Sequence, residues 1–414
     1  MKILTPFFVL TFILLFNCII KAQQDSSVIK YFPEKNKNDS ALIPFRTEQS
    51  DWFRNSEIPS FVFTSPGGKF SLGIGGFFNL TTSFDFDGIT DNLDFVTYDI
   101  DVPKDSIQNS QYQMFANTST LYFKVINKTS NGNLVGYVNA NFRGPESTFS
   151  LFQVYVKYIG FELGQDWSTF VDLASFPTTV NYTGLNAMPE AVNTMIRYTK
   201  TFSKNWEFGI GAEMPDFSTS YANTISLKQN VPDIPVYLEY NFDESHVRLS
   251  GIYRNLLYRN DYLNENQTET GAAVSLTGNV DITKKAQIYF QGLYGKGIGN
   301  YVQDLSIDEL NAVPVTGQPG QLAALPAYAY FGGLQYNFSK ILFATIMYSQ
   351  VKVMPENFNS PSYYSYAQQF TGNIFLNFLP SAQLALEYCF GKRVNQNGQY
   401  ATSNRLEFMM QYNF

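Results

Sequence analysis

The last ten residues of the chain, 405–414, restrict its fold more than any other stretch. Their apolar side chains fall on every second position: Leu406, Phe408, Met410, Tyr412 and Phe414. The positions between them are polar, apart from Met409. A period of two predicts a β-strand with two chemically different faces. The apolar face of such a strand packs either in the core of a soluble sandwich or against lipid, in a membrane barrel whose polar face lines a wet lumen.

The same alternation recurs throughout the chain after residue 68. The first segment runs from Lys69 to Phe86. Fifteen more follow at about residues 117–127, 134–143, 149–158, 161–170, 194–202, 206–213, 235–242, 246–257, 270–282, 286–294, 327–338, 341–352, 366–378, 383–392 and 403–414. The total of sixteen is even, as expected of a single-chain bacterial outer-membrane barrel.

The links between these segments alternate in length. Short links join each even segment to the next odd one, at 128–133, 159–160, 203–205, 243–245, 283–285, 339–340 and 379–381. The other links are longer, notably 87–116, 171–193, 214–234 and 295–326, with 144–148 as the one short exception. Outer-membrane barrels pair short periplasmic turns with longer external loops. We therefore predict an all-β fold: a transmembrane antiparallel β-barrel of about 16 strands, with short periplasmic turns and long extracellular loops.

The amino-terminal residues predict export. Lys2 precedes an apolar run that ends at Ile20, and Lys21-Ala22 come just before a polar stretch. This pattern is typical of a signal peptide, so we expect residues 1–22 to be cleaved. Residues 23–66 are polar and carry no heptad pattern, and we expect them to form a periplasmic segment ahead of a barrel at 67–414. The mature chain is then expected in the outer membrane, in contact with its lipid.

Composition disfavours several classes of function. Without residues 1–22 the net charge is 26 minus 35, or −9, which disfavours a nucleic-acid binder. Removal of that segment leaves Cys389 as the only cysteine, so no intramolecular disulfide is expected. The only histidine, His246, flanks a short turn, so a hydrolytic site with a histidine base is not expected. No phosphate, dinucleotide, zinc or calcium motif occurs, and we predict neither an enzyme nor a bound cofactor or metal.

The predicted lumen carries charges of both signs. Sixteen strands enclose a water-filled channel, and the link 171–193 is the candidate for its constriction. Six residues are candidates for lining the solute path: Arg143, Lys157, Asp172, Glu190, Arg197 and Arg254. The three arginines are expected in the outer half of the wall, facing few acids, which favours small anions of dicarboxylate size. The alternative is that acids pair with these arginines and leave a weakly cation-selective general pore.

Several stretches carry a resemblance to one known family. They are Gly136–Gly144 (GYVNANFRG), Val154–Tyr158 (VYVKY), Leu163–Phe170 (LGQDWSTF) and Met195–Thr199 (MIRYT). They are similar to the signature of DcaP-like outer-membrane porins, specifically over about residues 134–202 and only in architecture elsewhere. The resemblance implies a trimeric sixteen-stranded porin that admits anionic solutes such as dicarboxylates. The chain departs from the family at Asn139 and Asn141, where acids are expected, and in lacking a heptad-patterned extension.

Two further expectations come from porins in general. The loop that corresponds to 171–193 folds into the lumen, and the terminal Phe414 resembles the signal that such proteins present to the barrel-assembly machinery. We also expect a homotrimer whose contact surface lies around the first and last strands. The sequence feature that suggests this contact is the glycine cluster Gly73, Gly75 and Gly76, because glycines permit close approach.

The sequence therefore predicts a porin for passive diffusion of small hydrophilic solutes. One alternative is a gated, selective channel of an uptake system. Another is a closed barrel that serves as a surface anchor or adhesin and conducts nothing.

Overall fold

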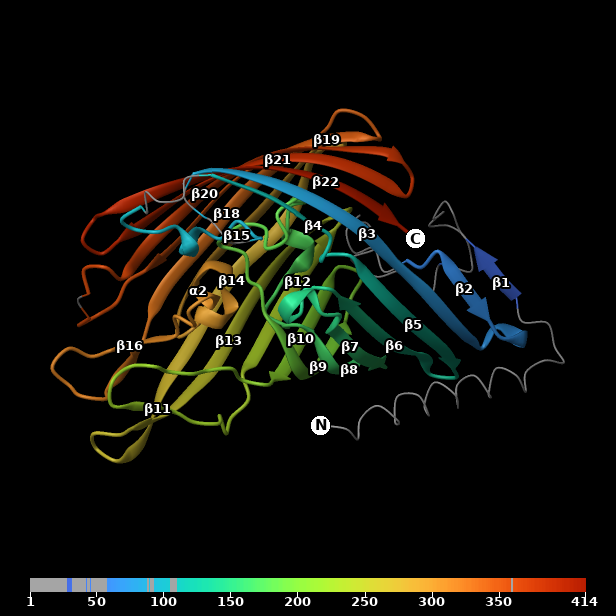
Figure 1. The fold of residues 1–414 in the computed structure, drawn as a ribbon. Coiled ribbons are helices and arrows are strands. Elements are labelled where there is room, and N and C mark those ends of the chain that lie inside the picture. Colours follow the sequence, from blue (N-terminus) through green and yellow to red (C-terminus); the bar gives the residue numbers. More distant parts are fainter. Residues whose placement is uncertain are drawn as a thin grey trace.

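The computed structural model describes residues 28–31, 42, 45, 58–87, 89, 93–104, 110–358 and 360–414. These residues form a closed antiparallel β-barrel of sixteen strands (Figure 1). Its strands are β3 (Phe70–Asp87), β5 (Thr120–Thr129), β6 (Gly132–Asn141), β7 (Ser150–Tyr158), β8 (Phe161–Trp167), β9 (Val192–Thr201), β10 (Trp206–Glu213), β12 (Ile234–Phe242), β13 (Ser245–Asn260), β14 (Glu265–Thr283), β15 (Ala286–Lys296), β18 (Pro326–Asn337), β19 (Leu342–Val353), β20 (Tyr364–Leu379), β21 (Ala382–Asn395) and β22 (Tyr400–Asn413). The predicted fold class is confirmed.

Several shorter elements lie outside the sixteen barrel strands. They are β1 (Val28–Tyr31), β2 (Phe61–Thr64), β4 (Gln111–Phe115), β11 (Thr224–Ser226), β16 (Ala312–Pro314), β17 (Leu322–Ala324) and one short α-helix, α2 (Gln303–Ser306). Within the described part of the chain, no helix has the length and apolar character that a membrane span requires.

The final strand closes the barrel. β22 pairs antiparallel with β3, with Tyr412 opposite Phe78. The backbone N–H of Phe414 donates to the Gly76 carbonyl at 2.9 Å, and the Gly76 N–H donates back to the Phe414 carbonyl at 3.1 Å. The Phe414 ring stacks on Phe78, with centroids 4.9 Å apart. The aromatic carboxyl terminus is thus built into the seam of the barrel.

The two faces of the wall follow the predicted alternation. Along β22, Leu406, Phe408 and Met410 are 37–45% exposed on the outside, whereas Arg405 and Glu407 are buried inside. Because an outward apolar band is what lipid requires of a barrel strand, this pattern fits a wall that faces lipid outside and polar groups inside.

The two ends of the barrel differ as predicted, with one correction. Short turns and the carboxyl terminus lie at one end, and the loops that carry β11 and β16 lie at the other (Figure 1). However, 144–148 is not the only short external link, because the loop between β13 and β14 is only 261–264 and that between β21 and β22 is only 396–399. In the strands of these two hairpins, buried and exposed side chains keep alternating well beyond the roughly ten residues that cross a membrane.

The start of β3 also corrects the glycine hypothesis. β1 pairs with β2, and β2 pairs with β3, at the end of the barrel that carries the short turns. A Cβ at Gly73 would lie 2.5 Å from Pro59 Cγ, and one at Gly75 would meet the Tyr122 ring, which belongs to a cluster of buried inward tyrosines. These two glycines therefore make room inside the barrel, and the prediction that they open its outer face to a neighbour is wrong. The predicted signal peptide, 1–22, lies outside the described residues.

Candidate functional site: the solute path through the barrel

The loop between β8 and β9, residues 168–191, lies inside the barrel. Near its middle, the N–H groups of Val180 and Asn181 donate to the Glu387 carboxylate on β21, at 2.9 Å each. Farther along, the Asn186 N–H donates to Gln369 Oε1 on β20 at 2.8 Å. The loop therefore crosses the lumen and is held by buried acceptors on the opposite wall.

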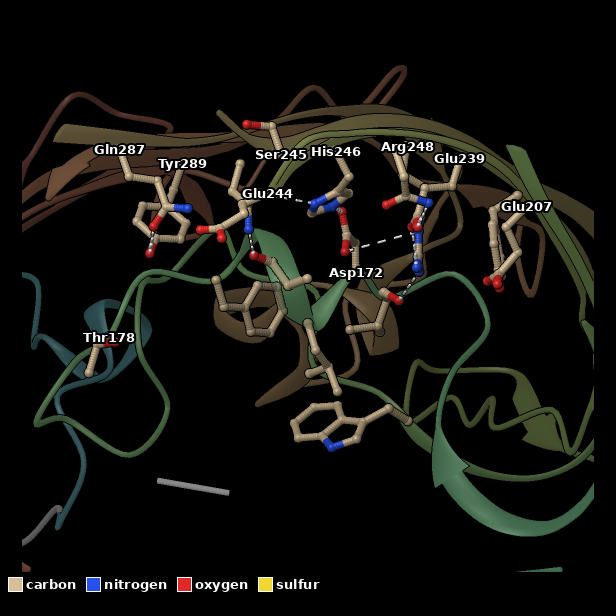
Figure 2. Close-up of a pocket in the computed structure, with 18 of the residues that line it drawn as sticks. Asp172, Thr178, Glu207, Glu239, Glu244, Ser245, His246, Arg248, Gln287 and Tyr289 are labelled. Atoms are coloured by element: carbon tan, nitrogen blue, oxygen red, sulfur yellow. Dashed lines mark hydrogen bonds and ion pairs between the residues drawn. The ribbon is translucent and has the colours of Figure 1, made fainter. Parts of the chain in front are cut away.

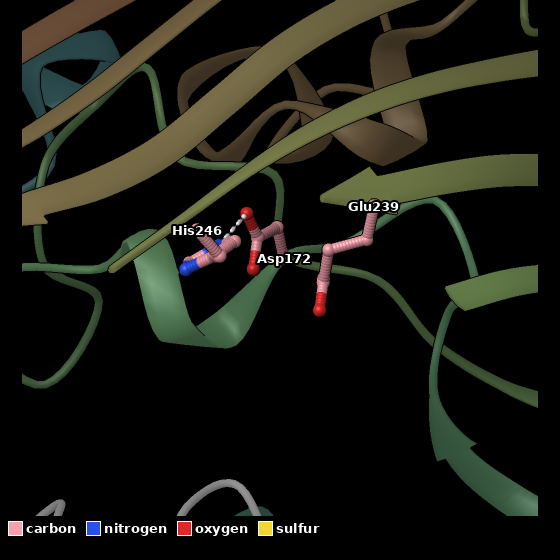
Figure 3. Close-up of side chains that lie close together, drawn as sticks. All are labelled: Asp172, Glu239 and His246. Carbon is pink, nitrogen blue, oxygen red and sulfur yellow. Dashed lines mark hydrogen bonds and ion pairs between the residues drawn. The ribbon is translucent and has the colours of Figure 1, made fainter. Parts of the chain in front are cut away.

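The first part of this loop is held by Asp172, which is fully buried. Its Oδ2 lies 2.8 Å from Nε2 of His246 on β13 and accepts from Thr277 Oγ1 on β14 at 2.6 Å. Figure 3 shows Asp172 between His246 and Glu239. Burial raises the pKa of Asp172, but Arg248 and His246 outweigh it and hold that pKa well below its usual range. Asp172 is thus a charged anchor on the wall.

A second loop, residues 297–325, packs with the first in the outer half of the lumen. Leu185 and Met188 of the first loop join a buried cluster with Val302 and Leu305 of the second and with inward residues of β13–β20. The Gln303 N–H donates to the Met188 carbonyl at 2.9 Å. Apolar packing between loops therefore fills much of the outer lumen.

A cavity of about 1730 Å³ lies between the first loop and the short turns. Figure 2 shows Asp172, His246 and Arg248 on its wall, with Glu207 and Glu239 to one side and Gln287 and Tyr289 to the other. Eight acidic residues line it: Glu162, Asp166, Asp172, Glu207, Glu239, Asp243, Glu244 and Asp281. Four basic residues line it: Lys157, Arg197, Arg248 and Lys284. The cavity lining thus holds four more carboxylates than lysines and arginines, and it also includes His246, which lies beside Asp172.

Lys157 and Arg197 both reach this cavity, each beside an acid. Lys157 Nζ lies 2.8 Å from Glu162. The Arg197 guanidinium lies 2.7 Å from Glu162 and 2.9 Å from Asp166, and it also donates to the Trp167 carbonyl at 3.1 Å. The large cavity that Arg197 lines extends to the short turns. Arg197 therefore does not lie in the outer half of the wall, and this prediction is wrong.

Arg143 and Arg254 are held by acids from external loops. Arg143 pairs with Asp94 through both guanidinium nitrogens and lies over the Tyr182 ring, 4.0 Å from its centroid. Arg254 is fully buried and its Nε lies 2.9 Å from Asp233 Oδ2. The prediction that these arginines face few acids is wrong, because the folded loops bring distant carboxylates to them.

The remaining candidate, Glu190, lines a separate outer pocket together with Arg254. Three anchors of the loop, His246, Arg248 and Glu387, are not among the six residues predicted for the solute path. Their only sequence signal is the inward phase of their strands, and this signal does not reveal which loop residue each one meets.

Two clusters among the described residues contain three possible metal ligands. They are Asp172 with Glu239 and His246, and Glu387 with Cys389 and Glu407. In the first cluster the Arg248 guanidinium lies 2.5 Å from Glu239 and 4.0 Å from Asp172, so a positive charge already occupies the space between the two acids. In the second, Arg405 lies 3.5 Å from Glu407. We assign no metal to either cluster.

Comparisons with known proteins agree with this architecture. Residues 69–414 match the DcaP outer membrane protein family. The crystal structure of the outer membrane channel DcaP of Acinetobacter baumannii superposes with a TM-score of 0.75 at 17% identity, covering 85% of this chain and 99% of that chain. No curated protein gives a significant sequence match.

Two more distant structures share the fold. An anion-selective porin from Comamonas acidovorans gives a TM-score of 0.55 at 13% identity, covering 83% of this chain and 100% of that chain. The trimer form of OmpT from Vibrio cholerae gives 0.53 at 10% identity, covering 83% and 99%. At such low identities the structural likeness establishes the fold alone.

Proposed function

Because the chain belongs to the DcaP outer membrane protein family, we propose that it forms a passive channel for small hydrophilic solutes, with a modest preference for cations. The observation that carries this proposal is the lining of the large cavity, where eight acidic residues face four basic ones. Fixed charge on the wall of a narrow aqueous path attracts ions of the opposite sign. The excess of carboxylates therefore favours cations.

The pairing of the basic residues supports the same preference. Arg197 and Arg248 each lie within 3 Å of a carboxylate, so little of their charge is left to attract anions. Lys157 is the most exposed of the three, with 43% of its side chain accessible, but its ammonium group also lies beside Glu162. The anion and dicarboxylate preference expected from the sequence loses one of its two bases, the arginines that face few acids. The other basis, the resemblance to DcaP-like porins, is unaffected.

The reversal potential of the pore in a potassium chloride gradient tests this proposal. Purified mature chain, shown to be folded, is reconstituted in a planar bilayer and the zero-current potential is recorded. A potential of the sign expected for potassium permeation supports cation preference, and the opposite sign would restore the anion hypothesis. Folded protein that shows no conductance would instead favour the anchor or adhesin reading, and conductance only in the presence of one solute would favour a gated uptake channel.

We also propose that the channel is a homotrimer. Support comes from the trimer form of OmpT, which shares the fold, and from the apolar outer surface near the barrel seam, where Phe78, Tyr112 and Met114 are 58–63% exposed. Crosslinking in native membranes should trap a species of three chains. Recovery of monomers alone, under conditions that trap a known porin trimer, would remove this proposal.

Export and insertion remain part of the proposed pathway. We infer that residues 1–22 are removed as a signal peptide and that Phe414 engages the barrel-assembly machinery. Mass spectrometry of the amino terminus tests the first inference. Phe414→Ser tests the second, since the aromatic ring that stacks on Phe78 is lost and the amount of barrel assembled in the membrane should fall.

A further inference from the structure

One sector of the barrel carries only positive charge on its outward face. The sector consists of six consecutive strands of the wall: β15, β18, β19, β20, β21 and β22. Four of the charged residues on these strands point inward: Glu387, Arg393, Arg405 and Glu407. The other three are all lysines, and they alternate with buried neighbours and point outward: Lys296, Lys352 and Lys392.

All three lysines lie near the external ends of their strands. Lys296 is the last residue of β15, Lys352 is the last but one of β19, and Lys392 is three residues from the end of β21. No outward charge occurs in the remaining length of the six strands. The charge of this sector is therefore confined to the external side of the membrane.

The first two lysines flank β18. Lys296 lies opposite Pro326. Lys352 lies opposite Tyr328, two residues farther along the same strand. Two strand spacings of about 4.8 Å and a two-residue rise of about 6.8 Å give a slope of about 35°. This slope is within the usual tilt of barrel strands, so an offset of this size can keep the two lysines at one depth in the membrane.

The third lysine continues the row. Lys352 and Lys392 flank β20 with the same offset of two residues. The short turns step in the same direction, because β20 continues three residues beyond Leu376, the partner of Leu342, before its turn. The offset between the lysines therefore compensates for the tilt of the strands. We call Lys296, Lys352 and Lys392 the lysine row.

The wall between the lysine row and the short turns is apolar on its outside. Ile346, Phe370 and Leu386, on β19, β20 and β21, are 43–56% exposed. Tyrosines lie between these residues and the row, and Tyr348 and Tyr388 are each 39% exposed. Tyrosine is typical of the boundary between hydrocarbon and headgroups. The lysine row thus lies where the apolar band ends, at the level of the headgroups of the outer leaflet.

The ammonium groups of the row are not neutralised by the protein. No carboxylate of a described residue lies within 4.0 Å of them, and Lys392 only lies over the Tyr400 ring, 4.5 Å from its centroid. Lys352 stands between Tyr328 and Tyr366, its cross-strand partners on the two neighbouring strands. Their hydroxyl groups can donate hydrogen bonds beside the lysines. The row therefore offers positive charge and donors to an anion.

We propose that the lysine row binds the phosphate groups of the lipopolysaccharide that forms the outer leaflet of the outer membrane. A phosphate is a strong acceptor for which lysine serves as a point charge. Neighbouring lysines of the row are about 12 Å apart at Cα, and their flexible stems can converge on a phosphate between them.

The apolar wall beside the row selects a lipid over a soluble phosphate. The acyl chains of a lipopolysaccharide molecule would cover the exposed side chains of Ile346, Phe370 and Leu386 while its phosphates meet the lysines. Basic residues next to a membrane-spanning surface bind acidic lipid headgroups in this way. The proposal does not depend on the ion preference of the pore, because the row lies on the outside of the wall.

The test measures binding of deep-rough lipopolysaccharide, which retains the phosphorylated lipid and a short inner core, to the mature chain folded in detergent. Titration followed by native mass spectrometry gives its dissociation constant for the unmodified protein and for Lys296→Gln/Lys352→Gln/Lys392→Gln. One lysine near an anionic lipid surface contributes about fivefold in affinity. Loss of all three should therefore raise the dissociation constant about a hundredfold.

A matched control removes three lysines from the other end of the barrel. Lys204→Gln/Lys285→Gln/Lys340→Gln alters exposed residues of three short turns, and none of them lines either cavity. Its dissociation constant should equal that of the unmodified protein. Lys352→Arg keeps the charge of the row and should also bind as the unmodified protein does.

A second arm needs no variant. The same lipopolysaccharide after removal of its phosphates should bind the unmodified protein about as weakly as the intact lipid binds the triple variant of the row. This arm decides the question even if that variant does not fold.

Three results would overturn the proposal: equal binding of the intact lipid by the triple variant, equal weakening by the control, or equal binding of the lipid without phosphates. A triple variant that loses the homotrimer but keeps its affinity for the lipid would also overturn it, because the row would then be a contact between copies of the chain.

Discussion

The outer loops should be held more tightly at pH 5 than at pH 7.5, because of Asp304. This residue lies in α2, outside the strands, and is fully buried. Its carboxylate accepts from Thr97 Oγ1 and the Tyr98 N–H at 2.7 Å, and from the Tyr364 hydroxyl at 2.5 Å. Burial raises the pKa of Asp304 to about 6, although these three donors and the charge of Arg393 oppose the rise.

The sign and size of the effect follow from this pKa. When the loop opens, Asp304 returns toward its ordinary pKa of 3.8, so the packed loop binds more protons than the open one between pH 3.8 and 6. The stabilisation is fully present below pH 3.8 and is lost as the pH rises through about 6. Between pH 5 and pH 7.5 this linkage amounts to about 1.4 kcal/mol, or about tenfold in the opening equilibrium.

Hydrogen exchange measured by mass spectrometry follows this opening directly. After correction for the intrinsic pH dependence of exchange, the protection of residues 299–312 should fall about tenfold from pH 5 to pH 7.5. Asp304→Asn keeps an oxygen acceptor but cannot titrate, so its protection should be independent of pH over this range. Protection that rises with pH in the unmodified chain, or an unchanged slope in Asp304→Asn, would refute the assignment.

Three further predictions concern the path and the topology. Arg197→Ala removes a cation from the large cavity and leaves two carboxylates beside it, so the reversal potential should move further toward cations; a shift toward anions would contradict the charge argument. Asp172→Ala breaks a buried charged anchor, which costs about 3–5 kcal/mol, so the single-channel current should fluctuate more between levels, and a trace as quiet as that of the unmodified pore would count against the anchor. On whole cells, Lys284→Cys in a short turn should be shielded from an impermeant thiol reagent whereas Gln318→Cys in a long loop should react, and the reverse pattern would invert the barrel.

The strands could be predicted from sequence because lipid and lumen impose a simple rule on each residue. A side chain faces one solvent or the other, so the period of two is readable without knowledge of any contact. The hairpin of β13 and β14 shows the limit of this rule. Beyond the membrane both faces of a strand meet water or loops, so polar residues occur on both faces. Buried and exposed positions still alternate there, but the apolar–polar pattern of the sequence weakens, and the predicted segments, 246–257 and 270–282, ended too early. The true strands run to Asn260 and from Glu265.

Ion pairs were predictable only where a short turn fixes the register. Lys157 and Glu162 flank the two-residue turn 159–160 and are cross-strand partners, so their pairing follows from the hairpin. Arg143 and Asp94 are 49 residues apart and meet only because an external loop folds inward. No local pattern encodes such a meeting.

The arginines of the wall explain why the path is left with an acidic lining. An inward-folded loop exposes backbone carbonyls that need donors, and a guanidinium can serve a carboxylate and a carbonyl at once. Four wall arginines do this, with carbonyl acceptors at 2.6–3.1 Å: Arg197 to Trp167, Arg248 to Val171, Arg254 to Gly297 and Asp216, and Arg405 to Leu93.

Each of these arginines also pairs with an acid, so its charge is neutralised where it holds a loop. Some acids also hold the inward loop, as Asp172 and Glu387 do, but a carboxylate at a short turn can remain in water. Asp243, Glu244 and Asp281 lie there, exposed at the edge of the large cavity. We therefore attribute the proposed cation preference of the channel to the way its loops are held. Substitutions that detach a loop from an arginine should change selectivity even when no residue of the cavity is altered.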